Sequence, residues 1–370
     1  MTRPRPPVFT AITLPEALAS SRDTGRLVLL DATASWCQPC QTMDRVTWVA
    51  PKLVAWLEEH AVALQVDVDA EKELAASLSI RSMPTVIVFR AGAELDRVVG
   101  MRGPVDLLAW LEAAQRGETT VDKLRRRVAR DANDMQSRYA LACGLATAGL
   151  LAEATDELVW LWQHVLEHSP SMVGVRGSYM LREIATLVER HPPARARFTE
   201  LRTALGGDGT GHDAKLEAIT DWMDLTMTLF DSHVLLEWFA RHRDALVARA
   251  LTEHPLHRRL VRLLTEHGRW ADVAQLYPDP AAALRQAHGQ LEAIHHKDFP
   301  AALLPMRPGM VEGLEGLLRR QGAEITVSLL AARRDDEARA IAAEVRRLLP
   351  GKKTDEALAK SARAAGVEVP

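Results

Sequence analysis

The sequence predicts an α/β domain over residues 8–116, followed by an all-α region that fills the rest of the 370-residue chain. Short apolar runs alternate with helical patterns up to about residue 116, as expected for a central mixed sheet with flanking helices. After Gly117 the β-branched runs disappear, and Ala, Leu, Arg and Glu dominate. This length permits two or three domains.

The α/β region begins with a helix that carries clear capping signals. Thr13 is the expected N-cap, Pro15 lies in the first turn, Glu16 completes a capping box, and the helix ends near Gly25. The periodicity then predicts a long helix from Cys37 to about residue 59, whose apolar side comprises Met43, Val46, Leu53 and Leu57. The remaining expected elements are strands 27–32, 62–68, 84–89 and 94–99, a short helix 70–78 and a closing helix 104–114.

The most informative segment is Trp36-Cys37-Gln38-Pro39-Cys40, which follows an apolar strand and opens the long helix. A helix N-terminus directs unpaired N–H groups and a partial positive charge at the first sulfur. This stabilises the attacking thiolate of Cys37 and typically lowers its pKa from ~8.5 toward ~7. Cys40 lies one turn further on, where its thiol can resolve a mixed disulfide. The pair therefore indicates thiol–disulfide exchange.

Two other interpretations of the pair remain open, a zinc site and a vestigial site. A structural zinc site needs four Cys or His ligands. The third cysteine, Cys143, lies about a hundred residues away in a helical segment, and His60 would add one ligand at most. The ligand count therefore favours redox chemistry, and Cys143 is expected to be a small buried residue.

Four features around this pair show that residues 8–116 resemble a thioredoxin domain. They are the Trp36–Cys40 segment itself, Asp31 six residues before Cys37, the Met83-Pro84-Thr85 loop, and Gly100 at the end of the last strand. The resemblance implies a thioredoxin-like fold, and it covers a little under a third of the chain.

The resemblance also implies roles for individual residues. A buried carboxylate holds its proton to higher pH, so Asp31 is the expected proton acceptor for Cys40; the alternative is an aspartate that caps a turn at the strand end. Met83-Pro84 is expected to be cis, and this loop offers backbone groups to an extended client peptide. The expected client-binding surface consists of Trp36, Gln38, Pro39, Met83 and Pro84.

Two residues depart from the family pattern. Gln38 stands where the family usually has glycine between the cysteines, while Pro39 is retained. Gln65 stands where the family has the lysine that accompanies the buried aspartate. A weaker proton relay and a more selective client range are therefore expected.

The rest of the chain is predicted to form paired helices. Residues 117–120 form an expected linker, with Thr120 as the cap of the next helix, before helical regions 121–205 and 212–370. Residues 139–154 resemble a tetratricopeptide helix–turn–helix with Gly149 at the turn, and residues 263–273 and 329–340 repeat the pattern, the latter without the glycine. The glycine-rich segment 206–211 is interpreted as a flexible linker, because no strand precedes it and no Gly-Lys-Ser/Thr follows. Four tryptophans are expected to be core anchors rather than groove contacts, namely Trp160, Trp162, Trp222 and Trp238.

The composition argues against several classes of function. Lys and Arg number 46 against 49 Asp and Glu, giving a net charge of −3, which argues against non-specific binding to nucleic acid or membranes. No apolar run approaches ~18 residues, and the first seven residues lack an apolar signal core. With three cysteines, a reducing, cytoplasmic compartment is expected. No cofactor is expected beyond the redox-active disulfide.

Three functions from different classes remain. The first is a thioredoxin-type oxidoreductase whose helical region selects protein clients or a partner, with a thioredoxin reductase as electron donor. The second is a holdase that binds unfolding proteins, on a resemblance to the chaperedoxins. In that family a thioredoxin domain precedes tetratricopeptide-like helices, and the protein can pass its clients to a chaperonin. Here the helical part is longer than is usual in that family. The third is a scaffold that uses the fold only to hold a partner.

Overall fold

The computed structural model describes residues 5–205, 215–248, 254–296 and 300–369. The chain divides into two compact units, residues 1–197 and 198–370, and each is described by itself. The predicted linker at 206–211 lies outside the described residues. In the described residues no helix is both long enough and apolar enough to span a membrane.

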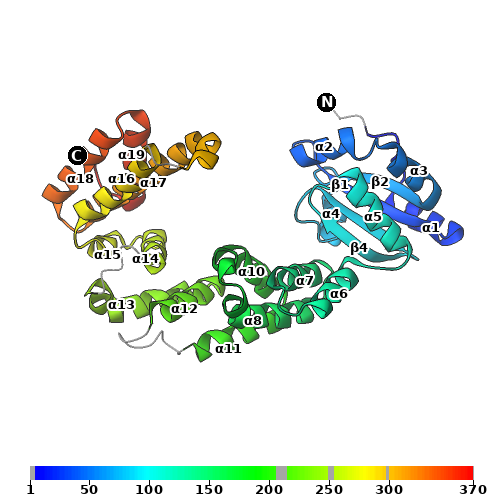
Figure 1. The fold of residues 1–370 in the computed structure, drawn as a ribbon, viewed down its shortest axis with the longest axis horizontal. Helices are drawn as coiled ribbons and strands as arrows, with labels where there is room; N and C mark the ends of the chain where they lie inside the picture. Colours follow the sequence, from blue (N-terminus) through cyan, green and yellow to red (C-terminus); the bar gives the residue numbers. More distant parts are fainter. Residues whose placement is uncertain (1–4, 206–214, 249–253, 297–299, 370) are drawn as a thin grey trace. The chain divides into compact units, whose positions relative to one another are not determined.

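The first unit begins with a four-stranded sheet in the order β2-β1-β3-β4 (Figure 1). β1 pairs with β2 in parallel and with β3 in antiparallel, and β4 is antiparallel to β3, so the sheet is mixed as expected. Five helices belong to this part. The elements are α1 Leu14–Thr24, β1 Leu27–Thr33, α2 Gln38–Val46, α3 Pro51–His60, β2 Ala61–Asp67, α4 Lys72–Ser77, β3 Thr85–Arg90, β4 Ala93–Val99 and α5 Pro104–Gln115.

Both faces of the sheet are covered because successive side chains of its buried strands point to opposite sides. Leu29 and Val88 face the cluster that includes Met43 of α2 and Leu107 of α5. Val28, Leu30 and Ile87 face the opposite cluster, with Leu14 and Ala17 of α1. The sheet therefore lies between two apolar layers, one of which includes α2.

The start of the chain follows the predicted capping. Thr13 and Glu16 form the capping box of α1, and Gly25 closes the helix in the left-handed conformation at φ 72°. The single long helix predicted from Cys37 to residue 59 is wrong, because α2 ends at Val46 and α3 begins at Pro51. Proline lacks an N–H and forces the preceding residue into extended backbone, as seen at Ala50 with ψ 123°. Val46, predicted on the apolar side of that helix, is the last residue of α2 and is 54% exposed.

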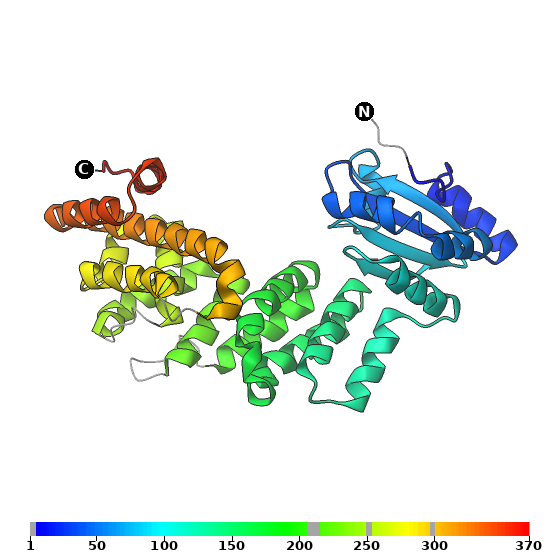
Figure 2. The same cartoon turned by 45° about the horizontal axis from the view of Figure 1, so that its top comes forward.

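The helical part of the first unit continues directly from α5. In Figures 1 and 2, α6, α7 and α8 lie side by side. Gly149, at φ 79°, turns the chain between α7 and α8 as predicted. The elements are α6 Thr120–Arg130, α7 Met135–Thr147, α8 Leu151–His168, η1 Pro170–Met172, α9 Val173–Val175, η2 Arg176–Met180 and α10 Leu181–Arg190, followed by α11 Pro192–Ala204, which extends past the unit's last residue, 197.

Thr120 was the predicted cap of α6, and this prediction is wrong by one residue. Thr119 is the N-cap, because Asp122 three residues later completes a capping box with it. The backbone N–H and the hydroxyl of Thr120 instead donate to Asp96 Oδ2 of β4, both at 2.8 Å. The start of the helical region is therefore bonded to the sheet.

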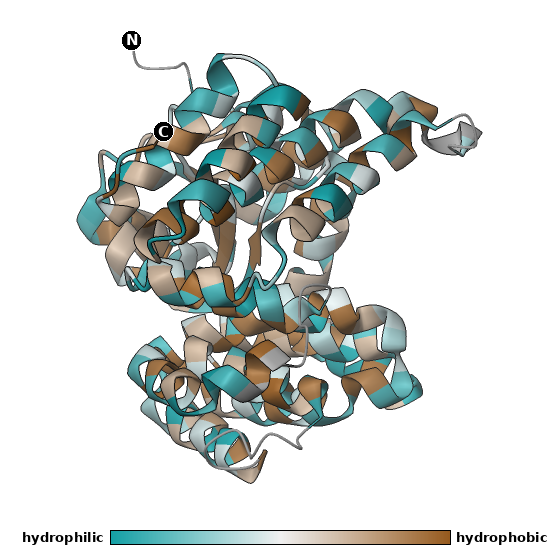
Figure 3. Ribbon diagram, turned by 90° about the vertical axis from the view of Figure 1, so that its left-hand side faces the viewer, coloured by the Kyte–Doolittle hydropathy of each residue, from teal (hydrophilic) through white to brown (hydrophobic). Residues whose placement is uncertain are grey.

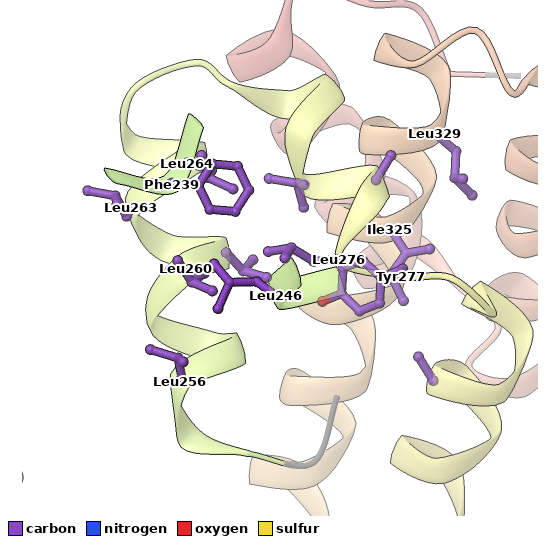
Figure 4. Packing of buried hydrophobic residues seen from close by; sticks show 14 of the residues in the cluster. Phe239, Leu246, Leu256, Leu260, Leu263, Leu264, Leu276, Tyr277, Ile325 and Leu329 are labelled. Carbon is purple, nitrogen blue, oxygen red and sulfur yellow. The ribbon is translucent and has the colours of Figure 1, made fainter. Parts of the chain in front are cut away.

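The second unit is a helical array around one large apolar cluster, part of which is drawn in Figure 4. Phe239, Leu260 and Leu264 belong to this cluster together with Ile325 and Leu329 of α17. Figure 3 shows apolar and hydrophilic residues alternating along individual helices, as expected for amphipathic helices. The elements are α12 Leu216–Thr228, α13 Ser232–Ala248, α14 Pro255–Glu266, α15 Trp270–Gln275, α16 Pro280–His295, η4 Ala301–Met306, α17 Arg307–Ala331, α18 Asp335–Leu348 and α19 Lys352–Ala365.

The predicted helix turns recur in the second unit. Gly268 (φ 68°) connects α14 to α15, and Arg333 (φ 61°) takes the left-handed position between α17 and α18, where the sequence pattern lacked its glycine. Of the four tryptophans expected in the core, Trp162, Trp222 and Trp238 are buried. The prediction is wrong for Trp160, which is half-buried and has the Arg138 guanidinium 3.6 Å from its ring centroid.

Candidate functional site

The cysteine pair lies at the N-terminus of α2. Cys37 is the N-cap residue, and its Sγ accepts a hydrogen bond from the backbone N–H of Cys40 at 3.2 Å. The two cysteines are joined in a disulfide, and they are only 3% and 2% exposed. Pro39 occupies the first turn, where its missing N–H leaves no helical bond unmade. The first sulfur therefore lies where backbone N–H groups and the helix dipole favour negative charge.

The loop before β3 packs against this disulfide. Met83 is half-buried against the cluster formed by Ala34, Cys37 and Cys40. The Met83–Pro84 bond is cis, as predicted. Gly100 follows β4 with φ 88° and donates its N–H to the Pro84 carbonyl at 2.8 Å, which holds the loop at the sheet edge.

The residues around the sulfurs provide the accessible surface. Trp36 is 62% exposed, and its Nε1 donates to Asp69 Oδ2 at 2.8 Å, which orients the ring. Gln38 and Pro39 are exposed as well. Three exposed side chains therefore border the sulfurs of Cys37 and Cys40, which are themselves buried.

Asp31 lies within β1, on the strand that leads to the cysteine loop, and is 2% exposed. Its neighbour across the parallel pair is Gln65 of β2, whose Nε2 donates to Asp31 Oδ2 at 2.9 Å. The departure noted in the sequence is thus a direct contact: an amide replaces a charged amine at the buried carboxylate.

Asp44 belongs to this group and was missed from the sequence. The same Nε2 of Gln65 donates to Asp44 Oδ1, also at 2.9 Å. The available signal was its position four residues after Cys40 on α2, which places both on one helix face.

The third cysteine is not part of this site. Cys143 lies half-buried in α7, and burial together with the nearby Glu183 carboxylate raises the pKa of its thiol to about 11. Among the described residues, no group of three or more His, Cys, Asp or Glu side chains is arranged to hold a metal ion.

Comparisons with known proteins bear on this site. The thioredoxin family model matches residues 14–113. A thioredoxin of Chlamydia trachomatis is 37% identical over 100 residues, which cover 27% of this chain and 93% of that protein. The chain belongs to the thioredoxin family.

Two plant relatives support this membership over a shorter stretch. A thioredoxin H-type of Oryza sativa subsp. indica is 38% identical over 87 residues, or 23% of this chain and 66% of that protein. Thioredoxin H-type 1 of Nicotiana tabacum is 42% identical over 82 residues, or 22% of this chain and 60% of that protein. The chain therefore spans less than two thirds of the length of these two relatives. The predicted fold class, a thioredoxin-like α/β domain before a helical region, is confirmed.

Proposed function

We propose that the protein is a thiol–disulfide oxidoreductase that acts on protein disulfides through Cys37 and Cys40. The observation that carries the proposal is the position of Cys37 as N-cap of α2, with its sulfur bonded to the Cys40 N–H. This environment stabilises a thiolate, which is the nucleophile in disulfide exchange. Family membership supports the same chemistry.

The proposed reaction has two steps. The Cys37 thiolate attacks one sulfur of the client disulfide, and the other client sulfur leaves as a thiolate that takes a proton from water. Cys40 then gives its proton to Asp31, and the Cys40 sulfur attacks Sγ of Cys37. The bond between Cys37 and the client breaks as the Cys37–Cys40 bond forms, and the second client sulfur leaves with the electron pair as a thiolate that takes a proton from water. The client gains two electrons, which the dithiol loses.

The proposed client surface surrounds the sulfurs. Trp36, Gln38 and Pro39 are exposed beside them, and Met83 and Pro84 form the loop that packs on the disulfide. An extended client segment would bond to the backbone of this loop as an added strand.

A thioredoxin reductase is the proposed electron donor and the cytoplasm the proposed compartment, because a reducing environment would return the disulfide to the dithiol.

The proposed division of the chain assigns residues 8–116 to this chemistry and residues 121–205 and 212–370 to client or partner binding.

A holdase is the second candidate, in the manner of chaperedoxins that pass clients to a chaperonin. The supporting observation is that both helical parts expose large apolar side chains: Val173 and Tyr179 in the first unit, and Leu304, Met306 and Leu317 in the second. Such side chains suit unfolded segments that expose their own apolar residues.

Reduction of insulin disulfides tests the first proposal. The wild type should reduce insulin with dithiothreitol as electron source, Cys37→Ser should lose the activity, and Cys143→Ser should retain it because its thiol lies outside the site. Equal activity of the wild type and Cys37→Ser would refute the oxidoreductase.

A trap variant then identifies the clients. Cys40→Ser should accumulate mixed disulfides through Cys37, which mass spectrometry names. If the wild type is inert but suppresses aggregation of a denatured client, and Cys37→Ser does so equally well, the holdase replaces the oxidoreductase. Absence of both trapped clients and aggregation suppression would favour the scaffold.

A further inference from the structure

One side-chain amide connects two carboxylates beneath the cysteine helix. Gln65 Nε2 of β2 lies 2.9 Å from Asp31 Oδ2 of β1 and 2.9 Å from Asp44 Oδ1 of α2. An amide nitrogen has two hydrogens, so one N–H can donate to each carboxylate. The opposite orientation of the amide would turn its carbonyl oxygen toward two carboxylates, which is repulsive.

The shared donor brings two like charges close together. Since both oxygens bond to one nitrogen, they lie within about 6 Å of each other. At this separation a second negative charge disfavours ionisation of the first carboxyl group. Asp31 is buried while Asp44 is half-buried, so Asp44 keeps more contact with water than Asp31 does.

The surroundings of Asp31 are otherwise mostly apolar. Its neighbour across β3 is Val86, which belongs to the cluster beneath α2 together with Leu29. From β2 the next residue on this face is Asp67, whose Oδ1 accepts the Asp69 N–H at the strand end. From α2 the carboxylate bonded to the same amide is Asp44.

We propose that Asp44 is a positioning residue for the exchange reaction: through Gln65 it holds Asp31 in place, and by its charge it makes Asp31 a stronger proton acceptor for Cys40. This inference rests on the proposed oxidoreductase function. The step itself is unchanged, with the proton passing from Cys40 Sγ to Asp31 and the freed thiolate attacking Cys37 Sγ. Where the family has an amine beside the buried aspartate, this chain has an amide and a second acid.

The direct test is a titration of Asp31 that needs no activity. Protein labelled with ¹³C at aspartate carboxyl groups is titrated by NMR in its disulfide form, and Asp31→Asn assigns the signal. In Asp44→Asn the side-chain oxygen can still accept from Gln65 while the charge is gone. The midpoint of Asp31 should fall by about 0.5 to 2 pH units, the range between water-like and protein-like screening at this separation.

Two further variants control the test. Asp23→Asn removes the same charge at an exposed site on α1 and should leave the midpoint unchanged. Gln65→Leu removes the shared donor but keeps both acids, so it should move the midpoint upward. An Asp31 midpoint in Asp44→Asn equal to that of the wild type would overturn the proposal.

The kinetic counterpart uses a small aromatic disulfide, 5,5′-dithiobis(2-nitrobenzoate). The second thionitrobenzoate released reports the attack of Cys40, and the midpoint of its pH–rate profile should fall in Asp44→Asn by the same amount as the NMR midpoint; an unshifted profile would contradict the proposal. A wild type that fails to reduce insulin would refute the proposed function by itself, and the NMR midpoints would still decide the coupling of the two acids.

Discussion

Removing the Asp96 carboxylate should loosen the start of the helical region. Asp96 is 7% exposed in β4, and its Oδ2 accepts three hydrogen bonds of 2.8 Å, from Trp110 Nε1 and from the backbone N–H and hydroxyl of Thr120. Trp110 belongs to α5, and Thr120 is the first residue of α6. One oxygen therefore joins a strand and two helices.

The size of the expected effect follows from the hydrogen-bond donors that Asp96→Ala would leave without an acceptor. The Trp110 indole is buried, and an orphaned buried donor costs about 1–3 kcal/mol. Thr120 is half-buried and would recover part of its bonding from water. The expected loss is about 3 kcal/mol in the free energy of opening this junction, which corresponds to roughly a hundredfold change in the opening equilibrium.

Hydrogen–deuterium exchange followed by mass spectrometry measures this opening in the full chain. Peptides covering residues 116–124 should exchange roughly a hundredfold faster in Asp96→Ala. Asp96→Asn keeps one oxygen acceptor and should show a smaller increase. Asp23→Ala, at an exposed position in α1, is the control and should leave these peptides unchanged. Unaltered exchange in Asp96→Ala would refute the reasoning.

Three further predictions concern other parts of the chain. Gly322→Ala should destabilise the second unit by about 1–3 kcal/mol in urea unfolding, because the new Cβ would lie 2.4 Å from Val345 Cγ2. The control, Gly313→Ala on the same helix, meets open space and should be neutral or stabilising. Equal effects of the two substitutions would contradict this prediction. Cys143, with its pKa raised to about 11, should react with iodoacetamide at pH 8 about a hundredfold more slowly than a thiol of ordinary pKa, and a normal rate would refute the burial argument. Burial lowers the pKa of His257, so the folded state binds fewer protons than the unfolded one. The free energy of unfolding should therefore fall as pH drops below about 6.5 toward the lowered pKa of the folded state. His257→Gln should flatten this pH dependence in acid unfolding, and an unchanged slope would count against the prediction.

Local signals in the sequence predicted much of the first unit. Capping residues and a glycine determined the bounds of α1, and alternation of apolar runs located the strands. The break between α2 and α3 departs from the single helix that was predicted, because the apolar periodicity continues across it although Pro51 begins a new helix. Thr119 and Thr120 have the same side chain, but Asp122 lies three residues after Thr119 and completes a capping box with it, while Thr120 bonds to Asp96.

By itself, the sequence determined where the candidate site lies: the two thiols at the mouth of a helix are a short-range pattern, while the buried acid on the preceding strand and the proline loop follow from the resemblance to the thioredoxin family. The tertiary structure decided which groups share an environment. Gln65 and Asp44 lie in different elements, and the bonds that Gln65 donates to Asp44 and to Asp31 exist because β1, β2 and α2 pack together. The same holds for Asp96 and Thr120. Hydrogen bonds between residues distant in sequence depend on register and packing, which no local pattern encodes.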